Sequence, residues 1–162
     1  MLRIIGSLMV GGSCFYLGLR KSLVLKQRYA SLQKIQNSLS LLETEIAFGG
    51  TELKNALLKA DNPLFIHAAQ DIDKLGIKAS WANAVKSCAS RLCLTPGDCD
   101  TLLMLGHRLG MTDTENQVKN INGVKNMLDL HIRAAKYDTE HFCRLYSGGG
   151  ALTGAFLVLM LL

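Results

Sequence analysis

The acidic side chains that could do chemistry in this chain lie in two short stretches. Glu43 and Glu45 are separated by one residue, and the same spacing recurs in a second set, Asp113, Glu115 and Gln117. General acid–base catalysis needs carboxyl groups that converge on one substrate atom, whereas helical residues two apart point in different directions. We therefore interpret both sets mainly as capping and solvated residues, with docking of a basic partner as the functional alternative.

The histidines and cysteines do not match the spacing of a familiar catalytic or metal site. The four histidines are scattered, and no HExxH, GxSxG or P-loop motif occurs. The five cysteines include no CxxC pair, and the gaps between Cys88, Cys93 and Cys99 are wider than zinc ligation favours. His131 shares an apolar stripe with Ala135, which is typical of a hydrogen-bonded boundary histidine. We expect no enzymatic activity, no cofactor and no bound metal.

The elements that must hold these residues begin and end with apolar segments. The chain has 162 residues, 49% of them hydrophobic, and a mean hydropathy of +0.20. Residues 2–19 contain one charge, Arg3, and residues 145–162 contain none. A helix of this length extends about 27 Å, close to the roughly 30 Å of a bilayer core. We predict transmembrane anchors at 1–20 and 145–162, with a helical bundle at 21–144 between them.

Basic residues after the first apolar segment indicate the orientation of the bundle. The net charge is +5, and residues 20–34 hold five basic side chains and no acidic one: Arg20, Lys21, Lys26, Arg28 and Lys34. A nucleic-acid-binding patch is one interpretation, but the positive-inside rule explains the same cluster. That rule places 21–144 in the cytoplasm. A cleaved signal peptide is an alternative for the first segment, but the apolar run continues past Cys14, which favours an uncleaved anchor.

Apolar residues recur at helical spacing, and no alternating strand pattern occurs. One seam follows the first anchor without an intervening proline: Leu25, Tyr29, Leu32, Ile35, Leu39, Leu42 and Ile46. A second set of heptad-like positions leads toward the C-terminal anchor: Gln117, Ile121, Val124, Leu128, His131, Ala135, Phe142 and Leu145. We predict that the first and last helices are long, antiparallel and continuous with the two transmembrane spans.

Start and stop signals divide the region between these long helices. Thr51, Asn62 and Thr95 are expected N-caps, and Pro63 and Pro96 suit the first position of a helix. Thr112 and Glu115 fit a capping box, and glycines 49, 76 and 110 are expected helix ends. The predicted helices are about 2–48, 52–59, 63–74, 79–92, 96–109 and a last one from about 113. The sequence therefore predicts an all-α antiparallel bundle of about six helices.

Several of these stretches together resemble the stage III sporulation protein AB family. Residues 32–49 are similar to the family run LxxLxxxLxxLETEIxYG, and residues 94–117 resemble its pattern of LTPxD followed by LxxLGxxLGxxDxExQ. Residues 154–162 resemble its closing anchor. The positions that match the family pattern, with an expected structural role, are Gly49, Thr51, Trp81, Pro96, Asp98, Gly106 and Gly110.

The resemblance implies a non-enzymatic membrane platform, similar to the inner-membrane platform protein F of type II secretion. Such a protein would sit in the outer forespore membrane with its bundle in the mother-cell cytoplasm. There it would bind a secretion-type ATPase, other proteins of the sporulation channel and further copies of itself, and no nucleic acid. The alternatives are a platform of a type II secretion or type IV pilus system in growing cells, a membrane-tethered enzyme, and a holin-like pore.

Overall fold

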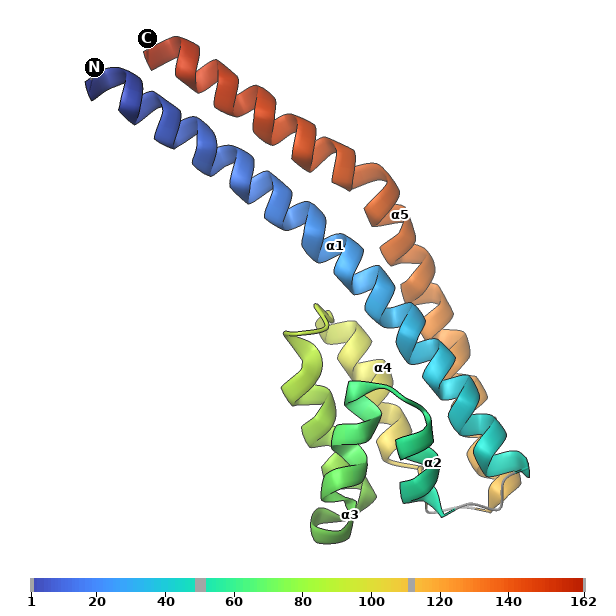
Figure 1. Cartoon of the computed structure of the whole chain (residues 1–162). Helices are drawn as coiled ribbons and strands as arrows, with labels where there is room; N and C mark the ends of the chain where they lie inside the picture. Colours follow the sequence, from blue (N-terminus) through green and yellow to red (C-terminus); the bar gives the residue numbers. More distant parts are fainter. Residues whose placement is uncertain (1, 49–51, 111–112, 162) are drawn as a thin grey trace. The chain divides into compact units, whose positions relative to one another are not determined.

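The computed structural model describes residues 2–48, 52–110 and 113–161. In these ranges α-helices are joined by turns and loops, and there is no strand (Figure 1). Side-chain surroundings are described for 12–13, 16–48, 52–110, 113–143, 145, 148–149 and 152. Five helices occupy the described ranges: α1 (Leu2–Phe48), α2 (Leu53–Lys59), α3 (Pro63–Ala89), α4 (Pro96–Gly106) and α5 (Thr114–Leu161). The all-α class is therefore confirmed. The five elements differ from the expected count of about six because α3 is counted as one helix across a non-helical residue, Gly76.

The chain divides into two compact units, and the division falls within both long helices. One unit comprises Met1–Tyr29 with Ala134–Leu162, and the other comprises Ala30–Arg133. We call them the terminal unit and the central unit. All the residues with candidate chemistry named above, Glu43 through His131, belong to the central unit.

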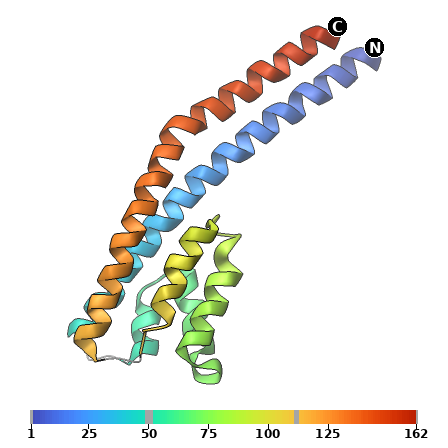
Figure 2. The same cartoon turned by 180° about the vertical axis from the view of Figure 1, so that it is seen from behind.

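In the terminal unit, α1 and α5 lie side by side and run in opposite directions (Figure 2). The thiol of Cys143 donates a hydrogen bond to the backbone carbonyl of Ser22 at 3.4 Å. Further along α1, the Arg28 guanidinium lies 3.6 Å from the Asp138 carboxylate. From Ser22 to Arg28 the residue number on α1 increases, while the partner on α5 changes from Cys143 to Asp138. The predicted antiparallel arrangement of these helices is therefore confirmed here.

The terminal unit carries many apolar side chains on its outside. Six that are more than half exposed are Tyr16, Leu17, Leu23, Tyr137, Leu145 and Leu152. Phe142 and Leu145, which the sequence places on heptad-like positions of the last helix, are both exposed. In the described residues we find no helix with a stretch both long and apolar enough to traverse a bilayer. The two transmembrane spans therefore stay a prediction.

The central unit buries the seam predicted for the first helix. Leu32, Ile35, Leu39 and Leu42 on α1 have no exposed surface. Their spacing of three and four residues places them on one face of the helix. On α5 the buried residues Ile121, Val124, Leu128 and Ile132 repeat the same spacing. The seam predicted for α1 is confirmed within this unit, as is the helical spacing predicted for α5.

The three short helices build their own core around the single tryptophan. Trp81 on α3 is fully buried, and its ring meets that of Phe65 edge-on, with centroids 5.2 Å apart. Buried leucines from the three helices complete this cluster: Leu57, Leu64, Leu102 and Leu105. Burial of each large apolar side chain stabilises the fold by about 1.5–3 kcal/mol. The cluster therefore fixes α4, which carries Asp98 and Thr101.

The helical backbone of α3 is interrupted at Gly76. The sequence predicts two helices separated by this glycine, and α3 does consist of two helical segments that meet at a non-helical Gly76. Gly76 has φ 75° and ψ 160°, a conformation that glycine adopts without steric cost. The hydroxyl of Ser80 donates a hydrogen bond to the Gly76 carbonyl at 2.8 Å, so the helix resumes directly after the kink.

Two predicted helix starts are confirmed in detail. The side chain of Asn62 accepts a hydrogen bond from the Leu64 backbone N–H, and Pro63 opens α3. Thr95 and Asp98 form a capping box at the start of α4, where Pro96 is the first residue. Gly110 has φ 73°, in keeping with its predicted place after a helix end, although α4 itself ends at Gly106 rather than near residue 109. Gly49, Thr51 and Thr112 lie outside the described residues.

Candidate functional site

The first predicted acidic pair is divided between two different intramolecular contacts. Glu43 accepts hydrogen bonds from Asn122 Nδ2 at 2.7 Å and from Lys125 Nζ at 2.8 Å, both on α5. Glu45 instead lies 2.7 Å from Nζ of Lys59, the last residue of α2. The two carboxylates thus hold α1 against different neighbours, as expected for residues two apart on a helix.

The protonation of Glu43 follows from these contacts. Partial burial disfavours its charged form, but the hydrogen bonds from Lys125 and Asn122 and the charge of Lys125 outweigh that effect. The pKa of Glu43 therefore lies below its usual value. Glu43 is a carboxylate at neutral pH, with its oxygen atoms engaged inside the central unit.

The second predicted set marks the start of α5. Asp113 accepts a hydrogen bond from Asn116 Nδ2 at 2.6 Å, and this bond is the main reason that the pKa of Asp113 is lowered. The backbone carbonyl of Asp113 accepts the Gln117 N–H at 3.0 Å, which makes Asp113 the capping residue. Glu115 pairs with Lys119 one turn later at 2.7 Å. The structure thus gives each acid a local partner, and docking by either set stays a prediction.

Trp81 and Gly106, two of the family-pattern positions, are explained by one contact. The indole N–H of Trp81 donates a hydrogen bond to the Leu102 carbonyl at 2.7 Å, which holds the ring over α4. A Cβ atom on Gly106 would lie 2.5 Å from Cδ1 of that ring. Only a residue without a side chain fits beside the indole, so this glycine is required by packing.

A buried cluster that the sequence did not indicate joins α4 to α5. Asp98 has no exposed side-chain surface, and its Oδ1 lies 2.8 Å from Nδ1 of His131. Its Oδ2 accepts the Thr95 backbone N–H at 2.9 Å. On the other side of the imidazole, Nε2 lies 3.2 Å from Oγ1 of Thr101. Asp98, His131 and Thr101 therefore form a continuous hydrogen-bonded chain, which we call the α4–α5 link.

The α4–α5 link has the residue types of a nucleophilic triad, but its surroundings suit a structural role. The Thr101 hydroxyl donates to the Gly97 carbonyl at 3.0 Å, and Thr101 is only 6% exposed. A nucleophile must instead present its oxygen to substrate while the histidine accepts its proton. His131 fits the predicted hydrogen-bonded boundary histidine. Sequence reasoning missed its partner because Asp98 is 33 positions away and was already explained as a helix-start residue.

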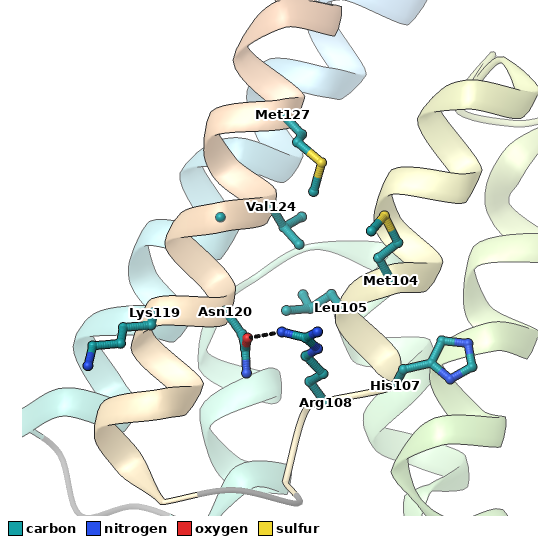
Figure 3. A pocket seen from close by; sticks show the side chains of 9 residues that line it. Met104, Leu105, His107, Arg108, Lys119, Asn120, Val124 and Met127 are labelled. Atoms are coloured by element: carbon teal, nitrogen blue, oxygen red, sulfur yellow. Dashed lines mark hydrogen bonds between the residues drawn. The ribbon is translucent and has the colours of Figure 1, made fainter.

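The central unit also contains a groove between the end of α4 and the first turns of α5 (Figure 3). Its volume is about 420 Å³, and nine residues line it: Met104, Leu105, His107, Arg108, Lys119, Asn120, Gly123, Val124 and Met127. The Arg108 guanidinium crosses from the α4 side and donates a hydrogen bond to Asn120 Oδ1 at 3.0 Å. The groove combines an apolar floor with basic residues at its end. We call it the α4–α5 groove.

The α4–α5 groove was not predicted from the sequence, since it depends on how two helices lie side by side. The predicted docking residues do not line it. The nearest connection is Glu115, whose carboxylate binds Lys119 at the edge of the groove. A basic residue on each side of the short loop between α4 and α5, Arg108 and Lys119, is the only signal that the sequence offers.

Comparison with known proteins agrees with the fold and the residue pattern. A solved structure titled stage III sporulation protein AB superposes with a TM-score of 0.63 at 24% sequence identity, covering 70% of this chain and 96% of that one. At that identity the likeness shows a shared fold. No curated protein sequence matches the chain. The sequence profile of stage III sporulation protein AB matches residues 3–162. The chain therefore belongs to the stage III sporulation protein AB family.

Proposed function

We propose that this protein is a non-enzymatic membrane platform of a secretion-like channel between mother cell and forespore, needed for endospore formation. The observation that carries the proposal is the family match over residues 3–162, which supports a role in sporulation. The platform would hold a cytoplasmic secretion-type ATPase on the central unit and would assemble with further copies and other channel proteins.

The surface of the terminal unit supports a membrane location. Its exposed apolar side chains within the predicted anchors, among them Tyr16, Leu17 and Leu152, would be covered by lipid rather than by water. Arg20 and Lys21 follow on α1 and suit the cytoplasmic edge of a bilayer. We propose that residues 1–20 and 145–162 of the terminal unit lie in the outer forespore membrane and that residues 21–144 face the mother-cell cytoplasm.

The packing of the central unit supports a scaffold role. Leucines and Trp81 fill its cores. In the α4–α5 link, the Thr101 hydroxyl donates its hydrogen bond to the Gly97 carbonyl and is therefore not presented to a substrate. Both α1 and α5 include residues of the central and of the terminal unit, and each is assigned as one helix. A scaffold needs such continuity to transmit force from a cytoplasmic motor to membrane partners.

The proposal is tested by deleting the gene and following sporulation under the microscope. We expect forespores to be engulfed normally and then to shrink or collapse. Rescue should require the full chain, and a version restricted to residues 21–144 should fail because it lacks both anchors. Normal spore formation by the deletion strain would reject the proposal and would favour a platform role in growing cells.

A further inference from the structure

The α4–α5 groove is an unusual surface for this protein because it is both open and apolar. Met104 is 55% exposed at one wall, and Met127 faces it from α5 (Figure 3). Leu105 and Val124 close the floor. Methionine is flexible and polarisable, which suits a surface that must adapt to a partner side chain. Water forms few hydrogen bonds with these four apolar side chains, so the free energy favours its replacement by an apolar group of a partner.

The charged residues that line the α4–α5 groove have one sign. Its lining contains Arg108 and Lys119 and no carboxylate. The Arg108 guanidinium crosses the end of the groove and donates a hydrogen bond to the neutral Asn120 side chain. This contact does not neutralise the positive charge of Arg108. Lys119 pairs with Glu115, but both side chains are more than two-thirds exposed, so the pair is weak and a partner carboxylate can replace it. The charge complementarity therefore favours an acidic occupant.

Gly123 keeps the α4–α5 groove open. It lies within α5, where alanine would stabilise the helix by up to about 1 kcal/mol relative to glycine. A Cβ atom at this position would meet no atom within 4 Å. Unlike Gly106, Gly123 is therefore not required by packing inside the protein. Its lack of a side chain instead leaves room for an external group between the two helices.

From these features we propose that the α4–α5 groove docks an acidic amphipathic helix of the ATPase partner. Apolar side chains of that helix enter between Met104 and Met127, and its carboxylates meet Arg108 and Lys119. Helices commonly bind in this way, with a few apolar anchors and a charged flank. Nucleic acid is a poor fit, because its binding requires many phosphate contacts and the lining offers two cations over an apolar floor. The inference rests on the proposed function and assigns the partner's binding face.

The test uses the full chain in detergent micelles and the purified secretion-type ATPase as the probe. Gly123→Leu places a side chain in the α4–α5 groove from a Cβ position that meets no atom within 4 Å, and we expect the protein to unfold at an unchanged or higher temperature. We expect this substitution to weaken ATPase binding about tenfold or more, which corresponds to about 1.4 kcal/mol. Asn126→Leu is the matched control, because Asn126 is exposed on the same helix and does not line the groove. It should change affinity less than about twofold.

A second pair of variants tests the charges. Arg108→Glu should weaken ATPase binding more at low salt than at high salt, whereas Arg108→Lys should retain most of it. Unchanged ATPase affinity in Gly123→Leu would overturn the inference and leave the platform role intact. Loss of self-association in that variant, with ATPase binding unchanged, would identify a second copy of the chain as the occupant and also overturn it. Failure of the wild-type chain to bind the ATPase would reject the docking role in the proposed function, and the inference with it.

Discussion

Nδ1 of His131 lies 2.8 Å from Oδ1 of Asp98, a carboxylate with no exposed surface. The other carboxylate oxygen caps α4 through the Thr95 N–H. One buried acid therefore both starts α4 and ties it to α5. A buried charge is tolerated only where its oxygen atoms are paired, so α4 depends on a residue of a distant helix.

The first prediction concerns the loss of that imidazole. His131→Ala removes the partner of Asp98 Oδ1 and should lower the free energy of unfolding by about 1–3 kcal/mol. Urea unfolding of the full chain in detergent micelles, followed by circular dichroism, measures the effect. The double variant Asp98→Asn with His131→Ala should lower the free energy of unfolding by less than the sum of the two single variants, because no buried charge is then left without a partner. Additive costs would show that the two side chains do not act as a pair.

The second prediction contrasts two glycines on neighbouring helices. Gly106→Ala forces a methyl group against Trp81 and should destabilise the fold by about 1–3 kcal/mol. Gly123→Ala meets open space and should stabilise it by up to about 1 kcal/mol. Because the chain has one tryptophan, the fluorescence of Trp81 reports directly on the first change. Its emission should shift toward the red in Gly106→Ala and stay unchanged in Gly123→Ala. The same spectrum for both variants would contradict the packing explanation.

Local signals in the sequence predicted most of the fold. The seam through Leu32, Ile35 and Leu39 depends only on helical spacing, and the start of α4 depends on Thr95 and its immediate neighbours. The interruption of α3 at Gly76 was also predicted, because glycine adopts a positive φ without steric cost. The α4–α5 link and the α4–α5 groove were missed. Both require residues from two helices to be brought together, and that follows from tertiary packing of α4 against α5.

The third prediction is a pH dependence at Glu43. In the folded chain its pKa is lowered, while in the unfolded chain it has the ordinary value of about 4.3. The stabilising contribution of Glu43 is therefore complete above the unfolded value and is lost as the pH falls through the folded value. Glu43→Gln should cost roughly 0.5–1 kcal/mol at pH 7 and nothing once both forms are protonated. Unfolding free energies measured between pH 7 and pH 3 test this convergence.

Glu115 provides the control for that experiment. Its pair with Lys119 is highly exposed, so Glu115→Gln should change the unfolding free energy little at any pH. If Glu43→Gln and Glu115→Gln gave the same pH profile, the hydrogen bonds from Asn122 and Lys125 would not be the source of the effect.

The fourth prediction concerns the reactivity of Cys99 on α4. Burial raises the pKa of its thiol, and the carboxylates of Asp98 and Asp100 raise it further. Because the thiolate is the reactive form, alkylation of Cys99 at pH 8 should be slower in the folded chain than in urea. Asp100→Asn removes one of the negative charges and should speed alkylation roughly two- to threefold, since one neighbouring charge contributes at most about 1 kcal/mol.

Peptide mapping by mass spectrometry resolves Cys99 from the other cysteines. Asp73→Asn, which removes a carboxylate that does not act on this thiol, should leave the rate unchanged. Equal acceleration by both substitutions would assign the effect to overall charge rather than to the carboxylates beside Cys99.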